Sequence, residues 1–517
     1  MLVQSVDSFF FFFSMSNIRI KNLSFGYEDS SDKIFDNLNL NLDSSWKLGL
    51  VGRNGRGKTT FLNLLRAKLS GTGKIETKLT FSYFPIEIDN PDNITLYELQ
   101  EKANFEQWEL ERELNLMATD PELLWQPFNT LSGGEQTKVL LALSFVDQDN
   151  FPLIDEPTNH LDEASRKQIA NYLKNHNKGY IVVSHDRDFL NRVTDHVLAI
   201  ENGEIHLYQG NYASYEDTKN KRDEFNAAKN NKLKSEITSL NTSRQRVKGY
   251  SEKAESKKNA KTHKNEIHSN LDKGFLGHKA AKMMQRSKIL EQRMDKKIEA
   301  KQGLMTNIED VPELNINFQE NYHQTLLEIK NLHLSVDDKT LFSNLNLLVK
   351  NRGVIALEGK NGSGKSTLLK VIMNKSTNAS YTGKIQLTNG LKISYLPQDF
   401  TEYTGTLKEF SENQKISYEE LLNSLKKMGF PRSSFNTKIE EMSMGQQKRV
   451  AIAKSLVEEA DLYLWDEPAN YLDVFNQDQL IKLIKENQPA MILVEHDKYF
   501  IDQVASQQVH LKKIKNI

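Results

Sequence analysis

Hydrophobic residues recur at helical spacing in two stretches of the middle segment, Glu216–Asp310. The first stripe comprises Phe225, Ala228, Leu233, Ile237 and Leu240, and the second comprises Met283, Leu290, Met294 and Ile298. Such spacing gives each helix one apolar face, so we expect two helices that pack as an antiparallel hairpin. Gly303, preceded by Lys296, Lys297 and Lys301, is the expected end of the second helix because cations there offset the helix dipole.

The stretch between these helices is basic and is followed by an aromatic residue. It contains Lys257, Lys258 and Lys261, and Phe275 lies within Gly274–Gly277, which has a glycine at each end. Flanking glycines let the backbone turn sharply, so we expect Phe275 at the apex. One interpretation is a tip that binds RNA phosphates and stacks on an unpaired base. The other is a solvated coiled coil whose apex is closed by a small apolar plug.

The segments on either side of the middle repeat each other, which predicts two copies of one domain. Lys21-Asn22-Leu23 recurs as Lys330-Asn331-Leu332, and Phe35–Leu40 recurs as Phe342–Leu347. The expected domain boundaries are 1–14 for an N-terminal extension outside the native domain, 15–215 for the first domain, 216–322 for the linker and 323–517 for the second domain.

Each copy contains a loop of the P-loop pattern, after an apolar strand and before a helical run. The loops are Gly52–Thr59 and Gly359–Ser366. Their glycines let backbone N–H groups close around phosphate oxygens at a helix N-terminus, and Lys58 and Lys365 are expected to neutralise phosphate charge. The candidate nucleotide-binding positions here are Gly52, Asn54, Gly55, Gly57, Lys58, Thr59, Thr60, Gly359, Asn361, Gly362, Gly364, Lys365, Ser366 and Thr367.

Further along each copy, one apolar strand ends in two acids and the next ends in histidine. The acid pairs are Asp155-Glu156 and Asp466-Glu467. The first acid of each pair is expected to bind Mg²⁺ and the second to orient or deprotonate the attacking water. A lone histidine is usually structural, but the repeated pair His185 and His496 is interpreted as two γ-phosphate sensors. The expected metal ligands are Thr59, Asp155, Ser366 and Asp466.

Charge and composition narrow the class of protein. The net charge is -1, so the basic excess of the middle is balanced by acidic flanks. Segregated charge of this kind favours a polyanionic partner for the middle. The absence of cysteine excludes disulfides and thiolate metal sites, and it is typical of a reducing cytoplasm. No apolar run approaches the ~20 residues that span a bilayer, and Phe9–Phe13 is too short and wrongly flanked for a signal peptide.

Leu131–Gln136 resembles the signature loop of ATP-binding-cassette (ABC) ATPases, and Met442–Gln447 is a weaker copy of it. Two cassettes in one chain, joined by a long basic linker, resemble the ABC-F group of this family, as do Asp155–Asp162, Ser184–Leu190 and Tyr208–Tyr215. The resemblance implies an α/β fold with two ABC-type P-loop ATPase cassettes joined by a long α-helical hairpin. It also implies a head-to-tail sandwich of the two cassettes, with two composite ATP sites.

The resemblance further implies which residues complete each site. Tyr27 is expected to stack on adenine at the first site, whereas Val336 takes that place at the second. The signature residues expected to cover nucleotide held by the opposite cassette are Ser132, Gly133, Gly134, Ser443 and Gly445. The expected catalytic residues are Glu156, Glu467, His185, His496 and Gln398.

The two sites are expected to be unequal. Gln398, which links the metal to the water site in the family, is replaced by Ile86 in the first copy. Met444 interrupts the second signature loop where the family has glycine. Both losses fall on the composite site around Lys58, whereas the site around Lys365 keeps both features.

The family implies a translation factor that hydrolyses ATP. ABC-F proteins bind the ribosomal exit site, and their hairpin reaches toward the peptidyl-transferase centre. Trp46–Thr60 and Asp272–Met284 are similar to the branch that confers resistance to lincosamides, streptogramin A and pleuromutilins. We therefore expect a cytoplasmic, ribosome-associated ATPase that uses ATP and Mg²⁺ and contacts 23S rRNA and exit-site tRNA of the 70S ribosome. Neither a membrane nor an obligate protein partner is expected.

Three alternatives stay open at this point. A housekeeping ABC-F factor would act on stalled ribosomes without any drug. The ATPase subunit of a drug exporter would dock on separate membrane subunits, although a long basic hairpin argues against that class. A DNA-handling ATPase is the third, because phosphate contacts do not separate rRNA from DNA.

Overall fold

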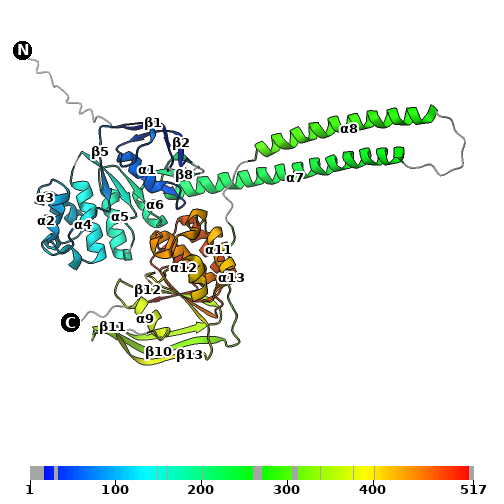
Figure 1. Ribbon diagram of the computed structural model, residues 1–517. Coiled ribbons are helices and arrows are strands. Elements are labelled where there is room, and N and C mark those ends of the chain that lie inside the picture. Colours follow the sequence, from blue (N-terminus) through cyan, green and yellow to red (C-terminus); the bar gives the residue numbers. More distant parts are fainter. Residues whose placement is uncertain are drawn as a thin grey trace, which may run out of the picture. The chain divides into compact units, whose positions relative to one another are not determined.

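The computed structural model describes residues 17–27, 33–147, 149–159, 161–201, 203–259, 271–305, 312–337, 339–375, 378–400 and 402–511, without the side chains of 251–259, 271–277, 279, 280 and 283. The chain forms two compact units, shown in Figure 1. One contains both repeated domains (Met1–Tyr215 and Val311–Ile517) and the other is Glu216–Asp310. The predicted extension 1–14 lies outside the described residues. Among the described helices, none is long and apolar enough to cross a membrane.

The first domain combines a small antiparallel sheet with a larger, mainly parallel one. Its elements are β1 (Asn17–Phe25), β2 (Phe35–Asp43), β3 (Lys47–Gly52), α1 (Lys58–Leu65), β4 (Thr72–Glu76), β5 (Thr80–Phe84), α2 (Thr95–Lys102), α3 (Gln107–Leu116), η1 (Pro121–Trp125), η2 (Phe128–Thr130), α4 (Gly133–Val146), β6 (Asn150–Asp155), α5 (Glu163–Asn175), β7 (Tyr180–Val183), α6 (Arg187–Val193), β8 (His196–Glu201) and β9 (Glu204–Gln209). The small sheet has the order β2-β1-β4 and the large sheet β5-β6-β7-β3-β8-β9.

The second domain repeats this plan. Its elements are β10 (Thr325–Val336), β11 (Lys339–Lys350), β12 (Gly353–Glu358), α9 (Lys365–Ile372), β13 (Ala379–Leu387), β14 (Ile393–Leu396), α10 (Leu407–Asn413), α11 (Tyr418–Lys427), η3 (Arg432–Asn436), η4 (Ile439–Glu441), α12 (Met444–Val457), β15 (Leu462–Asp466), α13 (Val474–Asn487), β16 (Ala490–Val494), α14 (Lys498–Val504) and β17 (Gln507–His510). The sheets have the orders β11-β10-β13 and β14-β15-β16-β12-β17.

The repeated Lys-Asn-Leu sequence has a structural cause. In both domains the asparagine lies at a β-bulge, where Asn22 and Asn331 have φ of 50° and 48°. Asparagine tolerates this left-handed conformation better than most residues. The backbone N–H of Asn22 donates to Asn39 Oδ1 at 3.0 Å, and that of Asn331 donates to Asn346 Oδ1 at 2.9 Å. The two short sequences therefore encode the same bulge.

The parallel strands are buried on both faces. In β6, Leu153 faces the hydrophobic cluster under the small sheet, whereas Ile154 faces the cluster formed with α4 and α5. All five residues of β16 are buried. This explains why these strands read as continuous apolar runs in the sequence rather than as alternating ones.

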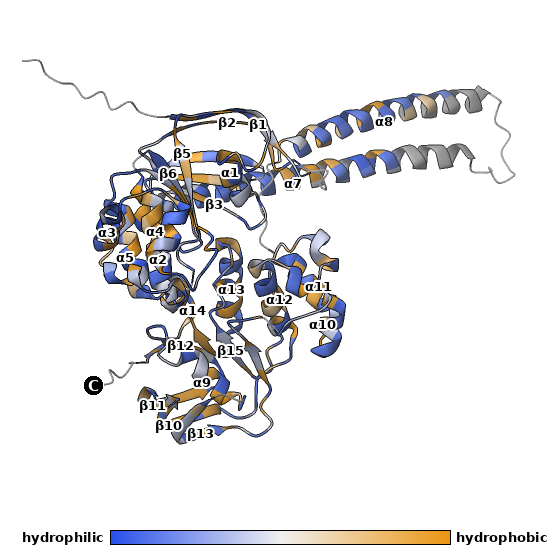
Figure 2. Ribbon diagram, turned by 60° about the vertical axis from the view of Figure 1, so that its left-hand side comes forward, coloured by the Kyte–Doolittle hydropathy of each residue, from blue (hydrophilic) through white to orange (hydrophobic). Residues whose placement is uncertain are grey.

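The middle segment forms a helical hairpin of α7 (Tyr212–Asn259) and α8 (Leu271–Gly303). With 48 residues, α7 is about 70 Å long. The helices are mostly hydrophilic, with scattered hydrophobic residues (Figure 2). Contacts between them follow antiparallel order: an ion pair joins Glu236 to Lys301, and another joins Arg244 to Asp295 at 2.7 Å.

The predicted stripes are only partly buried in this hairpin. Leu233 and Ile298 are each 8% exposed, whereas Phe225 is 71% exposed and Leu290 43%. The prediction that α8 ends at Gly303 is confirmed. The predicted fold class, two α/β cassettes joined by a long helical hairpin, is also confirmed.

Two linker predictions need correction. Phe275 and the run Gly274–Gly277 lie inside the first turns of α8, so the expected sharp turn at Phe275 is wrong. Glycine permits a turn but does not impose one, and the residues that follow favour a helix. The boundary predicted at residue 322 lies too late, because Leu314 is buried in the core of the second domain and Phe318 pairs with Ala460.

Candidate functional site

Parallel strand pairing brings the predicted chemical groups of each domain to one sheet edge. Strands β6, β7 and β3 are neighbours, and their carboxyl ends lead into Asp155, His185 and the P-loop. Strands β15, β16 and β12 do the same for Asp466, His496 and the second P-loop. Groups far apart in sequence therefore converge twice, at equivalent places.

The two P-loop lysines are held by the backbone of their own loops. Lys58 Nζ donates to Gly52 O at 2.7 Å and to Asn54 Oδ1 at 3.1 Å. Lys365 Nζ donates to Gly359 O at 2.8 Å. Both side chains are buried, and burial lowers the pKa of each lysine. A cation held in this way can meet phosphate charge without first being ordered.

The last glycine of each P-loop is required by geometry. Gly57 and Gly364 precede α1 and α9 with φ of 98° and 95°, in the left-handed region. A Cβ at Gly57 would lie 2.5 Å from Ile34 Cγ2, and one at Gly364 would lie 2.9 Å from Leu341 Cδ1. The other predicted loop residues lie in the same two loops or in the first turns of α1 and α9: Gly52, Asn54, Gly55, Thr59, Thr60, Gly359, Asn361, Gly362, Ser366 and Thr367.

The aspartates that end β6 and β15 have the surroundings of metal ligands. Asp155 Oδ2 accepts from Thr59 Oγ1 at 3.2 Å and from the Tyr83 hydroxyl at 3.0 Å. Asp466 is fully buried, and neither of its carboxylate oxygens has a hydrogen-bond partner among the described residues. Burial raises the pKa of both aspartates, and the nearby Ser366 hydroxyl opposes this at Asp466. Buried carboxylate oxygens without a hydrogen-bond partner, like those of Asp466, are suited to bind a divalent cation.

These residues do not form a complete metal cage by themselves. Within the described ranges, no group of three or more His, Asp or Glu side chains could hold a metal ion. Mg²⁺ is commonly bound by one or two carboxylates together with waters and substrate phosphates. The arrangement therefore fits a cation that arrives with a nucleotide.

Each aspartate is followed by a glutamate in a strained, buried position. Glu156 and Glu467 have φ of 52° and 50°. Burial, reinforced by neighbouring carboxylates, raises the pKa of Glu156 to about 8 and that of Glu467 to about 7. His185 Nε2 lies 3.2 Å from Glu156 Oε1, and His496 Nε2 lies 3.7 Å from Glu467 Oε1. Burial lowers the pKa of both histidines, so they are neutral near pH 7.

The two glutamates differ in their support. Glu467 Oε2 accepts from Gln398 Nε2 at 3.0 Å and from Asn470 Nδ2 at 2.5 Å. In the first domain Ile86 stands where a second glutamine would be, and Glu156 Oε1 is buried without a hydrogen-bond partner among the described residues. Two amides therefore orient Glu467, whereas Glu156 lacks the Gln398 equivalent.

The first P-loop is completed by the second domain. A Cβ at Gly445, in the second signature loop, would lie 3.7 Å from Asn54 Nδ2. The backbone N–H of Asn54 donates to Asp473 Oδ2 at 2.6 Å, and its side chain donates to Tyr471 O at 3.2 Å. Sequence reasoning missed Asp473, although its position equivalent to Asp162 in the internal repeat was a signal for it.

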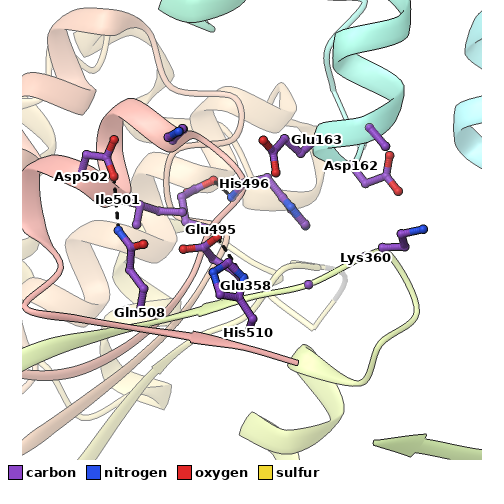
Figure 3. A pocket seen from close by; sticks show the side chains of 13 residues that line it. Asp162, Glu163, Glu358, Lys360, Glu495, His496, Ile501, Asp502, Gln508 and His510 are labelled. Atoms are coloured by element: carbon purple, nitrogen blue, oxygen red, sulfur yellow. Dashed lines mark hydrogen bonds and ion pairs between the residues drawn. The ribbon is translucent and has the colours of Figure 1, made fainter. Parts of the chain in front are cut away.

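The second P-loop faces the first domain across a cavity of about 400 Å³. Gly359, Lys360 and His496 line it from the second domain, and Asp162 and Glu163 line it from the first. Figure 3 shows Asp162 and Glu163 reaching the cavity from a separate ribbon, near His496 and Lys360. Both P-loops therefore lie at the contact between the two domains.

The remaining predicted residues occupy the rims of these sites. Tyr27 is half exposed, and its hydroxyl lies 3.1 Å from Thr60 Oγ1. Ser132 and Ser443 cap α4 and α12 through capping boxes. A Cβ at Gly133 would meet no atom within 4 Å, so packing within the protein does not explain this glycine, and it leaves room for a ligand. Gly134 lies in the first turn of α4.

Comparisons with known proteins agree with this geometry. A family model described as "ABC transporter" matches residues 35–159 and 342–470. The chain is 27% identical over 501 residues to "Ribosome protection protein VmlR" of Bacillus subtilis (strain 168), covering 95% of this chain and 86% of that protein. It is 28% identical to "ATP-binding protein Uup" of Buchnera aphidicola, covering 95% and 80%. A solved structure containing an archaeal ribosome recycling factor, aABCE1, is similar with a TM-score of 0.60 at 20% identity, covering 95% and 87%.

The unequal support of the two glutamates predicts unequal turnover. Glu467→Gln should lower steady-state ATP hydrolysis more than Glu156→Gln, because we expect the site whose glutamate is oriented by two amides to carry most of the turnover. Loss of one well-positioned catalytic group costs on the order of 10²-fold in rate. Phosphate release by the purified single variants measures this. Equal losses in the two variants would contradict the assignment of the faster site.

Proposed function

Because the chain belongs to the ABC-F family of ATPases, we propose that it acts on the ribosome and uses ATP to control how long it stays bound. The similarity to a protein named for ribosome protection supports this and extends over 95% of the chain, including the helical hairpin. We place the protein in the cytoplasm on the same ground.

We propose that both composite sites bind ATP with Mg²⁺, which supplies charge neutralisation at the transferring phosphate. Lys58 and Lys365 would contact the phosphates, and Thr59, Ser366, Asp155 and Asp466 would hold the metal. The orphaned carboxylate of Asp466 supports this. In their ionised forms, Glu156 and Glu467 would orient the attacking water and take its proton, and the neutral His185 and His496 would contact the γ-phosphate.

The hairpin is the proposed rRNA-binding element. Lys257 and Lys258 lie in the last turns of α7 and Phe275 in the first turns of α8, while Lys261 lies outside the described residues. Lysines on a long helix can neutralise rRNA phosphates without forming a core of their own. We propose that this end of the hairpin approaches the peptidyl-transferase centre from the exit site, beside exit-site tRNA.

We further propose that binding there protects the ribosome from lincosamides, streptogramin A and pleuromutilins. The relative named for ribosome protection supports this. A second candidate is a housekeeping factor for stalled ribosomes, which is favoured by comparable identity to Uup proteins. The two candidates differ in whether a drug is needed for the effect to appear.

ATP-dependent ribosome binding is the first test. The double variant Glu156→Gln, Glu467→Gln should bind ATP, hydrolyse it poorly and cosediment with 70S ribosomes to near saturation, because the closed cassettes cannot reopen. The unmodified chain should cosediment with a nonhydrolysable ATP analogue and be largely released with ADP. Raising the salt concentration should weaken binding, since phosphate contacts release counterions. If cosedimentation with ribosomes changes with neither the nucleotide nor the salt concentration, the proposal is rejected.

Drug protection is the second test. In a reconstituted translation reaction inhibited by a lincosamide, the chain should restore synthesis, and Phe275→Ala should weaken that effect. Stacking of an aromatic ring on a base contributes roughly 1 to 3 kcal/mol, so the protein concentration needed should rise by about tenfold.

Phe225→Ala is the matched control, because Phe225 is an exposed phenylalanine on the same hairpin. It should protect like the unmodified chain, and ATP turnover should be similar in both variants. If the chain relieves no drug of the three classes but rescues stalled ribosomes without drug, the housekeeping candidate replaces the protective one.

A further inference from the structure

Arg166 lies where the two domains meet, between their catalytic centres. Arg166 is on α5, one turn after Asp162 and Glu163, which line the cavity at the second P-loop. Its side chain is 11% exposed. It lines one small cavity that includes Glu156 and His185, and another that includes His496.

One nitrogen of Arg166 contacts both domains. Its Nη1 lies 3.2 Å from Asp186 Oδ2 in its own domain. The same Nη1 donates to the backbone carbonyl of His496 in the other domain at 3.4 Å. Asp186 directly follows His185, so Arg166 joins the loop of one predicted γ-phosphate sensor to the loop of the other.

These contacts complete a chain of neighbours between the two catalytic glutamates. Glu156 Oε1 lies 3.2 Å from His185 Nε2, and Asp186 is covalently next to His185. Arg166 connects Asp186 to His496, whose Nε2 lies 3.7 Å from Glu467 Oε1. The two steps through Arg166 are an ion pair and a hydrogen bond, the step from His185 to Asp186 is covalent, and the two steps between glutamate and histidine are close contacts. A shift of either histidine loop changes the fit of the shared arginine.

Arg166 also interacts electrostatically with carboxylates of both loops. Asp497, next to His496, is buried, and its carboxylate is repelled by Asp186 across the domain contact. The Arg166 guanidinium offsets this repulsion between the two loops. Arg166 therefore lies near carboxylates of both sensor loops.

The arrangement has no equivalent from the second domain. Gln477 occupies the position of Arg166 in the internal repeat. Its side chain donates to Ala469 O at 3.3 Å and to Leu472 O at 3.4 Å, both within its own domain. The link between the sensor loops is therefore built once, by the first domain.

We propose that Arg166 is a positioning residue that couples the two ATP sites, so that hydrolysis at one depends on the state of the other. A movement of His185 at one site would displace Asp186. Arg166, which contacts Asp186, would then shift and change its hydrogen bond to the carbonyl of His496. The proposal concerns the ATPase itself and does not depend on the ribosome or on any drug.

Additivity of turnover tests this in purified protein without ribosomes. Each single variant, Glu156→Gln or Glu467→Gln, leaves one site active. If the sites work independently, the ATP turnover rates of the two variants add up to the rate of the parent protein, which carries neither change. Coupling free energies typically correspond to about 5-fold to 150-fold effects. In the wild-type background we expect the summed rate of the two variants to be about fivefold or more below the rate of the parent protein. We call this difference the shortfall. In an Arg166→Gln background, which copies the internal counterpart Gln477, the sum should match its parent.

A merely structural role predicts a different result. If Arg166 only stabilises the domain contact, Arg166→Gln lowers the turnover of the parent protein and of both glutamate variants by the same factor. The shortfall then stays unchanged, which overturns the proposal. A wild-type background with no shortfall overturns it as well. Should Arg166→Gln fail to fold, Arg166→Lys serves instead. It keeps the cation near Asp186 but lacks the planar fork, so the shortfall should shrink.

Arg187→Gln is the matched control. Arg187 makes an ion pair across the domain contact, with Asp478 at 2.6 Å, but the chain of contacts between the sensor loops does not pass through its side chain. In the Arg187→Gln background the shortfall should equal that of the wild type. The melting temperature should fall by about as much as in Arg166→Gln. Loss of the shortfall in Arg187→Gln would assign the coupling to the strength of the interface and reject the specific link.

Discussion

Parallel pairing of three buried strands is the constraint on which the site depends. When β7 lies between β6 and β3, the end of one strand supplies an acid pair, the next a histidine and the third a phosphate loop. The backbone N–H of Glu156 donates to Val183 O at 2.9 Å, and that of Glu467 donates to Val494 O at 2.8 Å. This bond ties the loop of each acid pair to the neighbouring strand that ends in histidine. It holds the glutamate at a positive φ that an unconstrained chain would avoid.

The same fold used twice has produced two unequal centres. Second-domain residues hold Glu467 with two amides, whereas Ile86 gives Glu156 no such support. In the first P-loop, the backbone N–H of Asn54 donates to the carboxylate of Asp473 from the second domain. Buried, oriented groups stabilise a developing charge better than loosely held ones. Inequality is therefore a property of local contacts and not of the overall fold.

Features that depend on short stretches were predictable from the sequence. The P-loops and the strand-end acids each follow from residues close together in the chain. The hairpin followed from its stripes, although Phe225 on the first stripe is exposed. Contacts between distant segments were not predictable: Asp473 and Arg166 are ordinary helix-start residues until the domains meet. Phe275 was assigned to a turn because glycine allows one, yet the helical tendency of its neighbours prevailed.

We propose that each ATP site is built from both domains of one chain. The absence of cysteine lets it be tested with one introduced pair, Arg187→Cys and Asp478→Cys, which replaces an ion pair across the domain contact. In the Glu156→Gln, Glu467→Gln background with ATP, a short bismaleimide should link the pair within one chain, and removing nucleotide should lower the yield. Absence of the link with ATP, or links only between two chains, would contradict the account.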